Sequence, residues 1–167
     1  MIKKFFTGLA IVACFVACKS NSSDSASAFS YNEDFVNKEK SLEPMITTTE
    51  GNVGRFMDDQ KYDSIAIAGE KLEHQIDDVI KQIKAAPAPN VKGGEDFKEA
   101  GIRYFDYMKQ MYVVYKDFGN AKDEAGRNEQ LNKLQDLLAK KPTEMQHIQA
   151  AQQKFASDNG FRIKQSY

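Results

Sequence analysis

The stretch from Phe97 to Phe118, FKEAGIRYFDYMKQMYVVYKDF, is the most apolar segment of the chain outside its N-terminus. Its apolar side chains recur in steps of four and three residues, which is the period of one face of an α-helix. Such a helix needs helical partners on more than one side, so the stretch predicts an all-α domain. The core-facing positions are Phe97, Gly101, Tyr104, Met108, Met111, Tyr115 and Phe118, flanked by Phe105, Tyr107, Tyr112 and Val114.

Residues 62–85 show the clearest helical pattern in the remaining sequence. Gly69 lies within its apolar seam, where glycine costs about 1 kcal/mol of helix propensity relative to alanine. We expect a neighbouring helix with large aromatic side chains to approach closely at Gly69 and compensate for this cost. The prolines at 87 and 89 end the pattern. The seam consists of Ile65, Gly69, Leu72, Ile76, Val79 and Ile83.

Two longer helices are predicted at the ends of the domain, and each contains a proline. The apolar pattern of residues 31–58 holds its phase through Pro44, and the pattern after Leu131 holds its phase through Pro142. Because proline removes a backbone hydrogen bond, we expect kinked first and last helices. A break between residues 43 and 51 and a helix that restarts at Pro142 are the alternatives. Together the four segments predict an up-down four-helix bundle.

Two polar residues, Lys141 and Gln152, fall at seam positions of the last helix. A polar residue in a seam fixes the register of the helices, lines a cavity, or extends its polar end to solvent. The third role, at the end of a bundle, is the most common one.

The first 18 residues have the features of a bacterial export signal. Lys3 and Lys4 precede the mostly apolar residues 5–17, and the small residue Ala17 precedes Cys18. An apolar stretch of about 13 residues is too short to cross a bilayer as a stable helix. The motif Phe15-Val16-Ala17-Cys18 resembles the lipobox of bacterial lipoproteins, in which the cysteine becomes the acylated first residue of the mature protein.

Two alternatives to lipidation at Cys18 exist. The motif Ile11-Val12-Ala13-Cys14 also fits a lipobox, although an apolar stretch would then begin the mature chain, whereas a polar segment follows Cys18. An ordinary secretory signal with incidental cysteines is the second alternative. In either case residues 19–167 contain no cysteine, which excludes disulfides and thiolate metal sites from this part of the chain.

Residues 19–30, KSNSSDSASAFS, are rich in serine and contain one aromatic residue. Such a segment buries too little apolar surface to offset its ordering entropy, so we expect a flexible tether. The predicted organisation is a signal peptide at 1–17, lipidated Cys18 with a tether to residue 30, a helical bundle domain at 31–160 and a C-terminal tail at 161–167.

Glu144 and His147 have the Glu-x-x-His spacing that di-iron proteins place in four-helix bundles. A di-iron site needs a second such pair, and the other histidine, His74, has no acidic residue three positions before it. His147 also falls on the solvent side, because Ile148 occupies the seam. We therefore predict a surface histidine, no metal and no cofactor.

No other motif of the chain indicates catalysis. The formal net charge is -1 at pH 7, and no basic run could neutralise a line of phosphates, which argues against nucleic-acid binding. The sequence has neither a Gly-x-Ser-x-Gly motif nor a phosphate-binding glycine loop. We predict that the protein is not an enzyme.

The helix at 97–118 carries the candidate binding residues. Tyr104, Tyr107 and Tyr112 are expected in the core first and at a binding surface second. Ile102 and Val113 project from the polar side of the helix and would leave an apolar spot for a partner. The sequence therefore predicts a non-catalytic binding or structural module with an envelope protein as partner. A small-molecule-binding bundle and a hydrolase of envelope polymers with paired carboxylates are the alternatives.

The body of the chain, from YNEDFV at residue 31 to QKFASDNGF ending at residue 161, resembles small helical lipoproteins of unknown function from Gram-negative, Bacteroidota-like bacteria. The resemblance implies attachment to the membrane through a lipid anchor, with placement in the outer membrane of the cell envelope, and it supplies no catalytic residues. Residues 19–24 contain one acidic residue, whereas surface-export signals of such bacteria are acid-rich. Orientation toward the periplasm or the exterior stays open, as does the oligomeric state.

Overall fold

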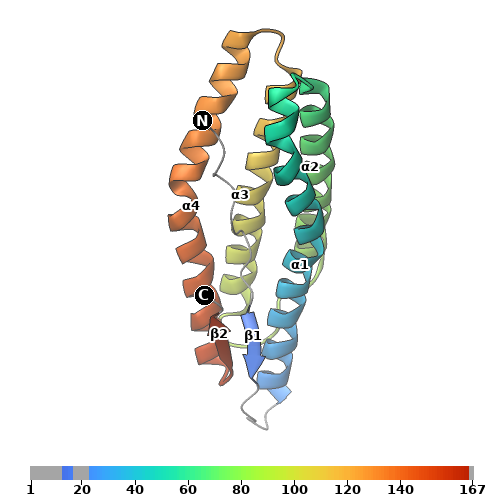
Figure 1. Ribbon diagram of the computed structural model, residues 1–167. Coiled ribbons are helices and arrows are strands. Elements are labelled where there is room, and N and C mark those ends of the chain that lie inside the picture. The colour runs from blue at the N-terminus through green and yellow to red at the C-terminus, as the bar shows by residue number, and fades with distance from the viewer. Residues whose placement is uncertain (1–12, 17–22, 166–167) are drawn as a thin grey trace.

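The computed structural model describes residues 13–16 and 23–165, and the side chains of residues 23–163 (Figure 1). Four long helices run alternately up and down, which confirms the predicted all-α bundle. They are α1 (Ser23–Asp58), α2 (Tyr62–Ala85), α3 (Gly94–Asn120) and α4 (Glu124–Asp158).

Two short strands, which the sequence did not predict, lie at one end of the bundle. β1 (Ala13–Val16) pairs antiparallel with β2 (Arg162–Gln165), with Ala13 opposite Gln165. The C-terminal tail therefore contains a strand, and its partner comes from the segment predicted to be a signal peptide.

The central helix is α3, as the apolar pattern of its sequence predicts. All eleven residues of its predicted core face are buried. α2 and α4 both pack against α3, and α1 packs against α2 (Figure 1). Because α3 has neighbours on two sides, its apolar face covers about half of its circumference.

An aromatic cluster joins α1 and α4 to the beginning of α3. The rings of Phe97 and Phe155 stack with their centroids 4.7 Å apart, and Phe35 lies 5.3 Å from Phe97. Tyr31 contacts both Phe97 and Phe155 edge to face. Large rings bury much apolar area per residue, so this cluster holds three helices together at one end of the bundle.

α2 and α3 approach each other closely at two glycines. A Cβ atom on Gly69 would lie 2.6 Å from the backbone nitrogen of Lys116 and 2.8 Å from the carbonyl oxygen of Tyr112. A Cβ atom on Gly119 would overlap the backbone of Tyr62 and Ala66. The expected compensation for Gly69 is confirmed, because this residue permits contact with the aromatic-rich helix.

Both proline-containing helices continue without a break. α1 runs through Pro44 and α4 runs through Pro142, so neither a break at 43–51 nor a restart at Pro142 occurs. Both prolines are exposed, so solvent can satisfy the carbonyl groups that lose their helical partners. The buried residues on either side of Pro44, Leu42 and Ile46, keep the apolar face of α1 in phase.

The helix start predicted at residue 31 is wrong, since α1 begins at Ser23. Ser25 and Ala28 are buried and extend the inner face of α1 by one heptad, and the ring of Phe29 packs edge to face on Phe161 at 5.7 Å. Small serine and alanine side chains fit this end of the bundle without large apolar groups, so the sequence pattern concealed the helix. The remaining tether, residues 19–22, lies outside the described residues.

We expect Gly69→Ala to destabilise the bundle by about 1–3 kcal/mol, because a methyl group would push two backbones apart. Gly54→Ala is the matched control. Gly54 is exposed in α1, and nothing lies within 4 Å of its added Cβ atom, so this change should stabilise the protein by about 0.5–1 kcal/mol. Thermal or urea unfolding followed by circular dichroism measures both. Equal stabilities of the two variants would contradict the close approach of α2 and α3.

Candidate functional site

An open groove of about 450 Å³ runs along the surface between α3 and α4. We call it the α3–α4 groove. Its floor is partly apolar, and its two walls carry charged groups. The lining residues are Glu99, Ile102, Arg103, Asp106, Tyr107 and Gln110 from α3, and Leu137, Lys140 and Glu144 from α4.

A bidentate ion pair joins the two walls of the groove. The guanidinium of Arg103 donates to Glu144 through Nε at 3.0 Å and through the terminal nitrogen Nη2 at 2.8 Å. The hydrogen bond and charge of Arg103 lower the pKa of Glu144 below its ordinary value. The Arg103 side chain is 61% exposed, so the pair contributes at most about 1 kcal/mol to stability.

Tyr107 and Ile102 form the apolar part of the groove on the α3 side. The Tyr107 hydroxyl donates to the carbonyl oxygen of Leu137 at 2.9 Å, which ties α3 to α4. Burial, with a further contribution from the charge of Glu144, raises the pKa of Tyr107 to about 12. Ile102 is half-buried and packs against the core, so one side of its side chain faces the groove.

The predicted partner-binding residues differ in burial: the two aliphatic residues are half-buried, whereas the three tyrosines are buried. Ile102 lies in the α3–α4 groove, and Val113 is half-buried further along α3. Tyr104 and Tyr112 are each only 1% exposed, which confirms the core position predicted first for them and leaves little surface for a partner. Tyr107 is buried too, although it lines the groove. Helical neighbours cover these rings, as the apolar pattern of α3 predicts.

Two buried tyrosines instead connect α3 to α1. The Tyr104 hydroxyl donates to Glu39 at 2.6 Å, and the Tyr112 hydroxyl donates to Glu50 at 3.2 Å. Burial raises the pKa of both tyrosines well above the ordinary value. It also raises the pKa of Glu50, and the hydrogen bond from Tyr112 opposes that change.

A second buried polar contact joins α1 to α4. Gln152 donates through Nε2 to Oδ1 of Asn32 at 2.8 Å, and both residues are buried. Gln152 therefore has the register-fixing role among those predicted for a polar seam residue. Lys141 is half-buried, and its charge lowers the pKa of Glu50.

Glu144 and His147 do not form a chelating pair directed into the bundle. His147 is 52% exposed, as predicted, and Glu144 is engaged by Arg103. His74 is exposed on α2. Within the ranges 13–16 and 23–165, no three histidine, cysteine or acidic residues are grouped closely enough to hold a metal ion.

The charged lining of the groove could not be found from the sequence. Glu99, Asp106 and Lys140 look like ordinary solvated positions on their helices, and only the packing of α4 on α3 makes them neighbours. The one signal available was the position of Ile102 on the polar side of α3.

Comparison with known proteins found no matching family model, no similar curated protein and no similar solved structure. None of the helices in the described part of the chain is long and apolar enough to cross a membrane.

We expect the four tyrosines of α3 to resist ionisation in the folded protein, because burial raises their pKa values. Tyrosine in an unfolded chain has a pKa of about 10. The resulting stabilisation is present below that pH and is lost progressively as the pH rises above it. Alkaline titration, with tyrosinate absorbance and circular dichroism recorded together, tests this expectation. Ionisation of all tyrosines near pH 10 with unchanged helix content would contradict it.

Proposed function

We propose that the protein is a non-catalytic lipoprotein of the bacterial cell envelope, anchored in the outer membrane, that binds a protein partner in the α3–α4 groove. The proposal of partner binding rests on the groove itself, in which the half-buried side chain of Ile102 lies between charged walls. The proposal of a lipid anchor rests on the lipobox in the sequence. Cys18 itself lies outside the described residues.

The charges of the groove suit a protein segment that carries a basic group on the side facing α3. Arg103 and Glu144 neutralise each other across the groove. Asp106 pairs with Lys109 at 3.5 Å, which leaves Glu99 on the α3 wall and Lys140 on the α4 wall. A segment that places an apolar side chain on Ile102 and a basic group near the α3 wall would match this arrangement.

Maturation at Cys18 would not disturb the bundle. Cleavage before this residue removes β1, so β2 loses its partner strand. The four helices and their buried side chains all lie between residues 23 and 161. The core that stabilises the domain therefore remains in the mature chain.

The alternatives receive less support. A hydrolase of envelope polymers needs a carboxylic acid that stays protonated near neutral pH, whereas Arg103 lowers the pKa of Glu144. A small-molecule site is usually an enclosed, mostly apolar cavity, whereas the α3–α4 groove is open and has charged walls.

Lipidation at Cys18 predicts a mature chain that begins at this residue and carries acyl chains, which together hold it stably on the membrane. Mass spectrometry of the N-terminal peptide checks the modification. Cys18→Ser should release the protein from the membrane fraction, and Cys14→Ser is the matched control that should not. An unmodified N-terminus beyond residue 18 would contradict lipidation.

For the groove, we expect a photo-crosslinking amino acid at Gln110 to capture a discrete partner in intact cells. Gln110 is exposed and lines the groove, so this replacement removes nothing from the core. The same amino acid at Ile67, an exposed position on α2, is the control. Addition of Glu99→Lys, at another exposed lining position, should weaken the Gln110 crosslink, since it reverses the charge of the α3 wall near which the basic group of the partner would lie. Identical crosslinked products from Gln110 and Ile67 would rule out the groove as the contact.

A further inference from the structure

We infer that one end of the bundle rests on the lipid bilayer, and that the bundle stands on this end. This end consists of the N-terminus of α1, the connection at 86–93 and the C-terminus of α4, which lie together in Figure 1. We call it the anchored end. The inference rests on the proposed lipidation of Cys18 and specifies which surface of the protein faces the lipid headgroups.

The first argument for this orientation is the short length of the tether between Cys18 and α1. Because α1 begins at Ser23, only residues 19–22 separate it from Cys18. Even a fully extended chain spans about 17 Å from Cys18 to Ser23. α1 contains 36 residues and is therefore about 54 Å long. The tether is much shorter than the bundle, so the N-terminus of α1 stays close to the membrane.

The anchored end is rigidly built, so its parts approach the membrane together. Asn159 donates through Nδ2 to the carbonyl oxygen of Lys92 at 2.9 Å, and the Lys92 ammonium pairs with Asp158 at 2.9 Å. Lys98 donates to the carbonyl oxygen of Ala86 at 2.6 Å. These contacts fix the 86–93 connection to the first turns of α3 and to the end of α4.

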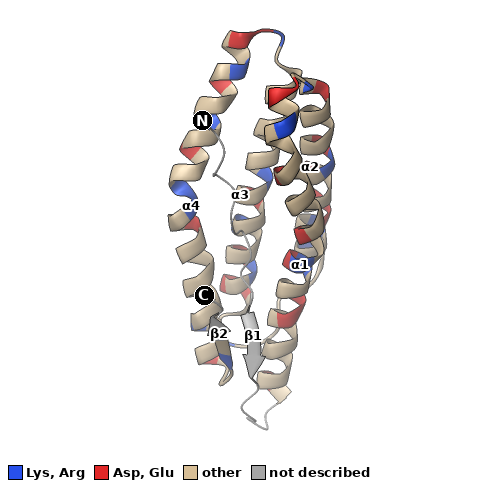
Figure 2. Ribbon diagram, viewed as in Figure 1, with Lys and Arg blue, Asp and Glu red and all other residues tan. Residues whose placement is uncertain are grey.

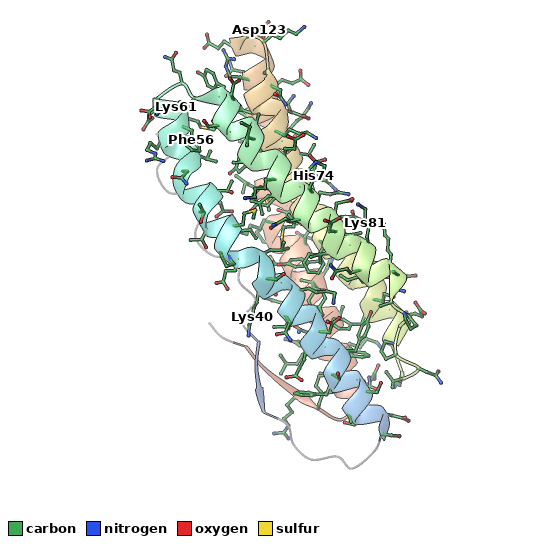
Figure 3. All side chains as sticks on the ribbon, turned by 90° about the vertical axis from the view of Figure 1, so that its right-hand side faces the viewer. Lys40, Phe56, Lys61, His74, Lys81 and Asp123 are labelled. Carbon is green, nitrogen blue, oxygen red and sulfur yellow. The ribbon has the colours of Figure 1, made fainter. Side chains whose placement is uncertain are left out.

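The sides of the bundle do not suit a membrane surface. A helix that lies in the interface buries an apolar face among the lipids. The outer side of α2 and α3 instead carries ion pairs, among them Lys109 with Asp77 at 3.1 Å. Charged residues follow the helices along their length (Figure 2), and His74 and Lys81 lie along the side of α2 (Figure 3). Among the described residues, Ile67 is the only exposed large apolar side chain, and it lies near the start of α2, away from the connection at 86–93.

The exposed residues of the anchored end suit headgroups rather than the hydrocarbon interior. They include Pro87, Asn90, Lys92 and Arg162. Lys92 and Lys154 share the carboxylate of Asp158, and Glu95 and Asp96 lie in the first turn of α3 at the same end, so electrostatic attraction to anionic lipid is weak. The lipid anchor therefore holds this end in place, and the contact should persist at high salt.

This orientation places the α3–α4 groove beside the membrane. Its α3 wall extends from Glu99 to Gln110, about 8 to 24 Å along the axis from the start of α3 at the anchored end. The groove opens sideways between two upright helices. A protein that occupies it must reach a level close to the headgroups, so we expect a partner attached to the same membrane.

Single tryptophans can test the orientation, because the chain contains no tryptophan. The mature chain from Cys18 onward has one thiol, which is coupled to a maleimide-bearing phospholipid in phosphatidylcholine vesicles. Tryptophan replaces Asn90 at the anchored end, His74 on the side, or Lys122 at the opposite end, and all three positions are exposed. Circular dichroism verifies the fold of each variant. Quenching by a nitroxide on the lipid headgroup then reports proximity to the bilayer.

We expect Asn90→Trp to lose roughly half of its emission, and His74→Trp and Lys122→Trp to lose little, since only the first position lies within reach of the short tether. The pattern should be the same at low and high salt. Equal quenching of all three variants, or strongest quenching of His74→Trp, would overturn the upright orientation. Because the lipid is attached chemically, this result is independent of acylation in cells, and failure of the proposed lipidation would be seen separately by mass spectrometry.

Discussion

The backbones of α2 and α3 pass so close at Gly69 and Gly119 that a side chain on either glycine would collide with the opposite helix. This contact fixes how the two helices cross and how far each can slide. Close approach also lets the seam of α2 pack fully against the aromatic face of α3, which increases the dispersion contacts of each buried side chain. The remaining helices are placed relative to this pair.

α1 and α4 are held by aromatic packing and by specific polar contacts. At the anchored end, Phe97 stacks on Phe155 and packs against Phe35, which connects three helices. Along the bundle, Tyr104 and Tyr112 donate hydrogen bonds to glutamates of α1, and Gln152 joins α4 to Asn32. Buried polar groups are costly without partners, so these contacts select one register of α1 and α4 against slipped alternatives.

The proposed function follows from the surfaces that this packing leaves open. The tyrosines of α3 are used in the core, so the binding candidate shifts from these rings to the α3–α4 groove around Ile102. The early start of α1 shortens the tether, and this observation supports the proposal of a domain that stands upright at the membrane. In that proposal the anchor would set the height at which the groove meets its partner.

The sequence by itself determined the fold class, because the helical period of apolar residues survives in every helix, and the buried faces of α2 and α3 could be named residue by residue. It also indicated the role of Gly69. Other features depended on neighbours distant in the chain. The start of α1 at Ser23 needs the surface against which Ala28 and Phe29 pack, and the hydrogen bond from Tyr104 to Glu39 needs α1 to lie beside α3. The α3–α4 groove combines residues about 40 positions apart in the sequence, and only tertiary packing brings them together, since helical periodicity describes one helix and not the space between two.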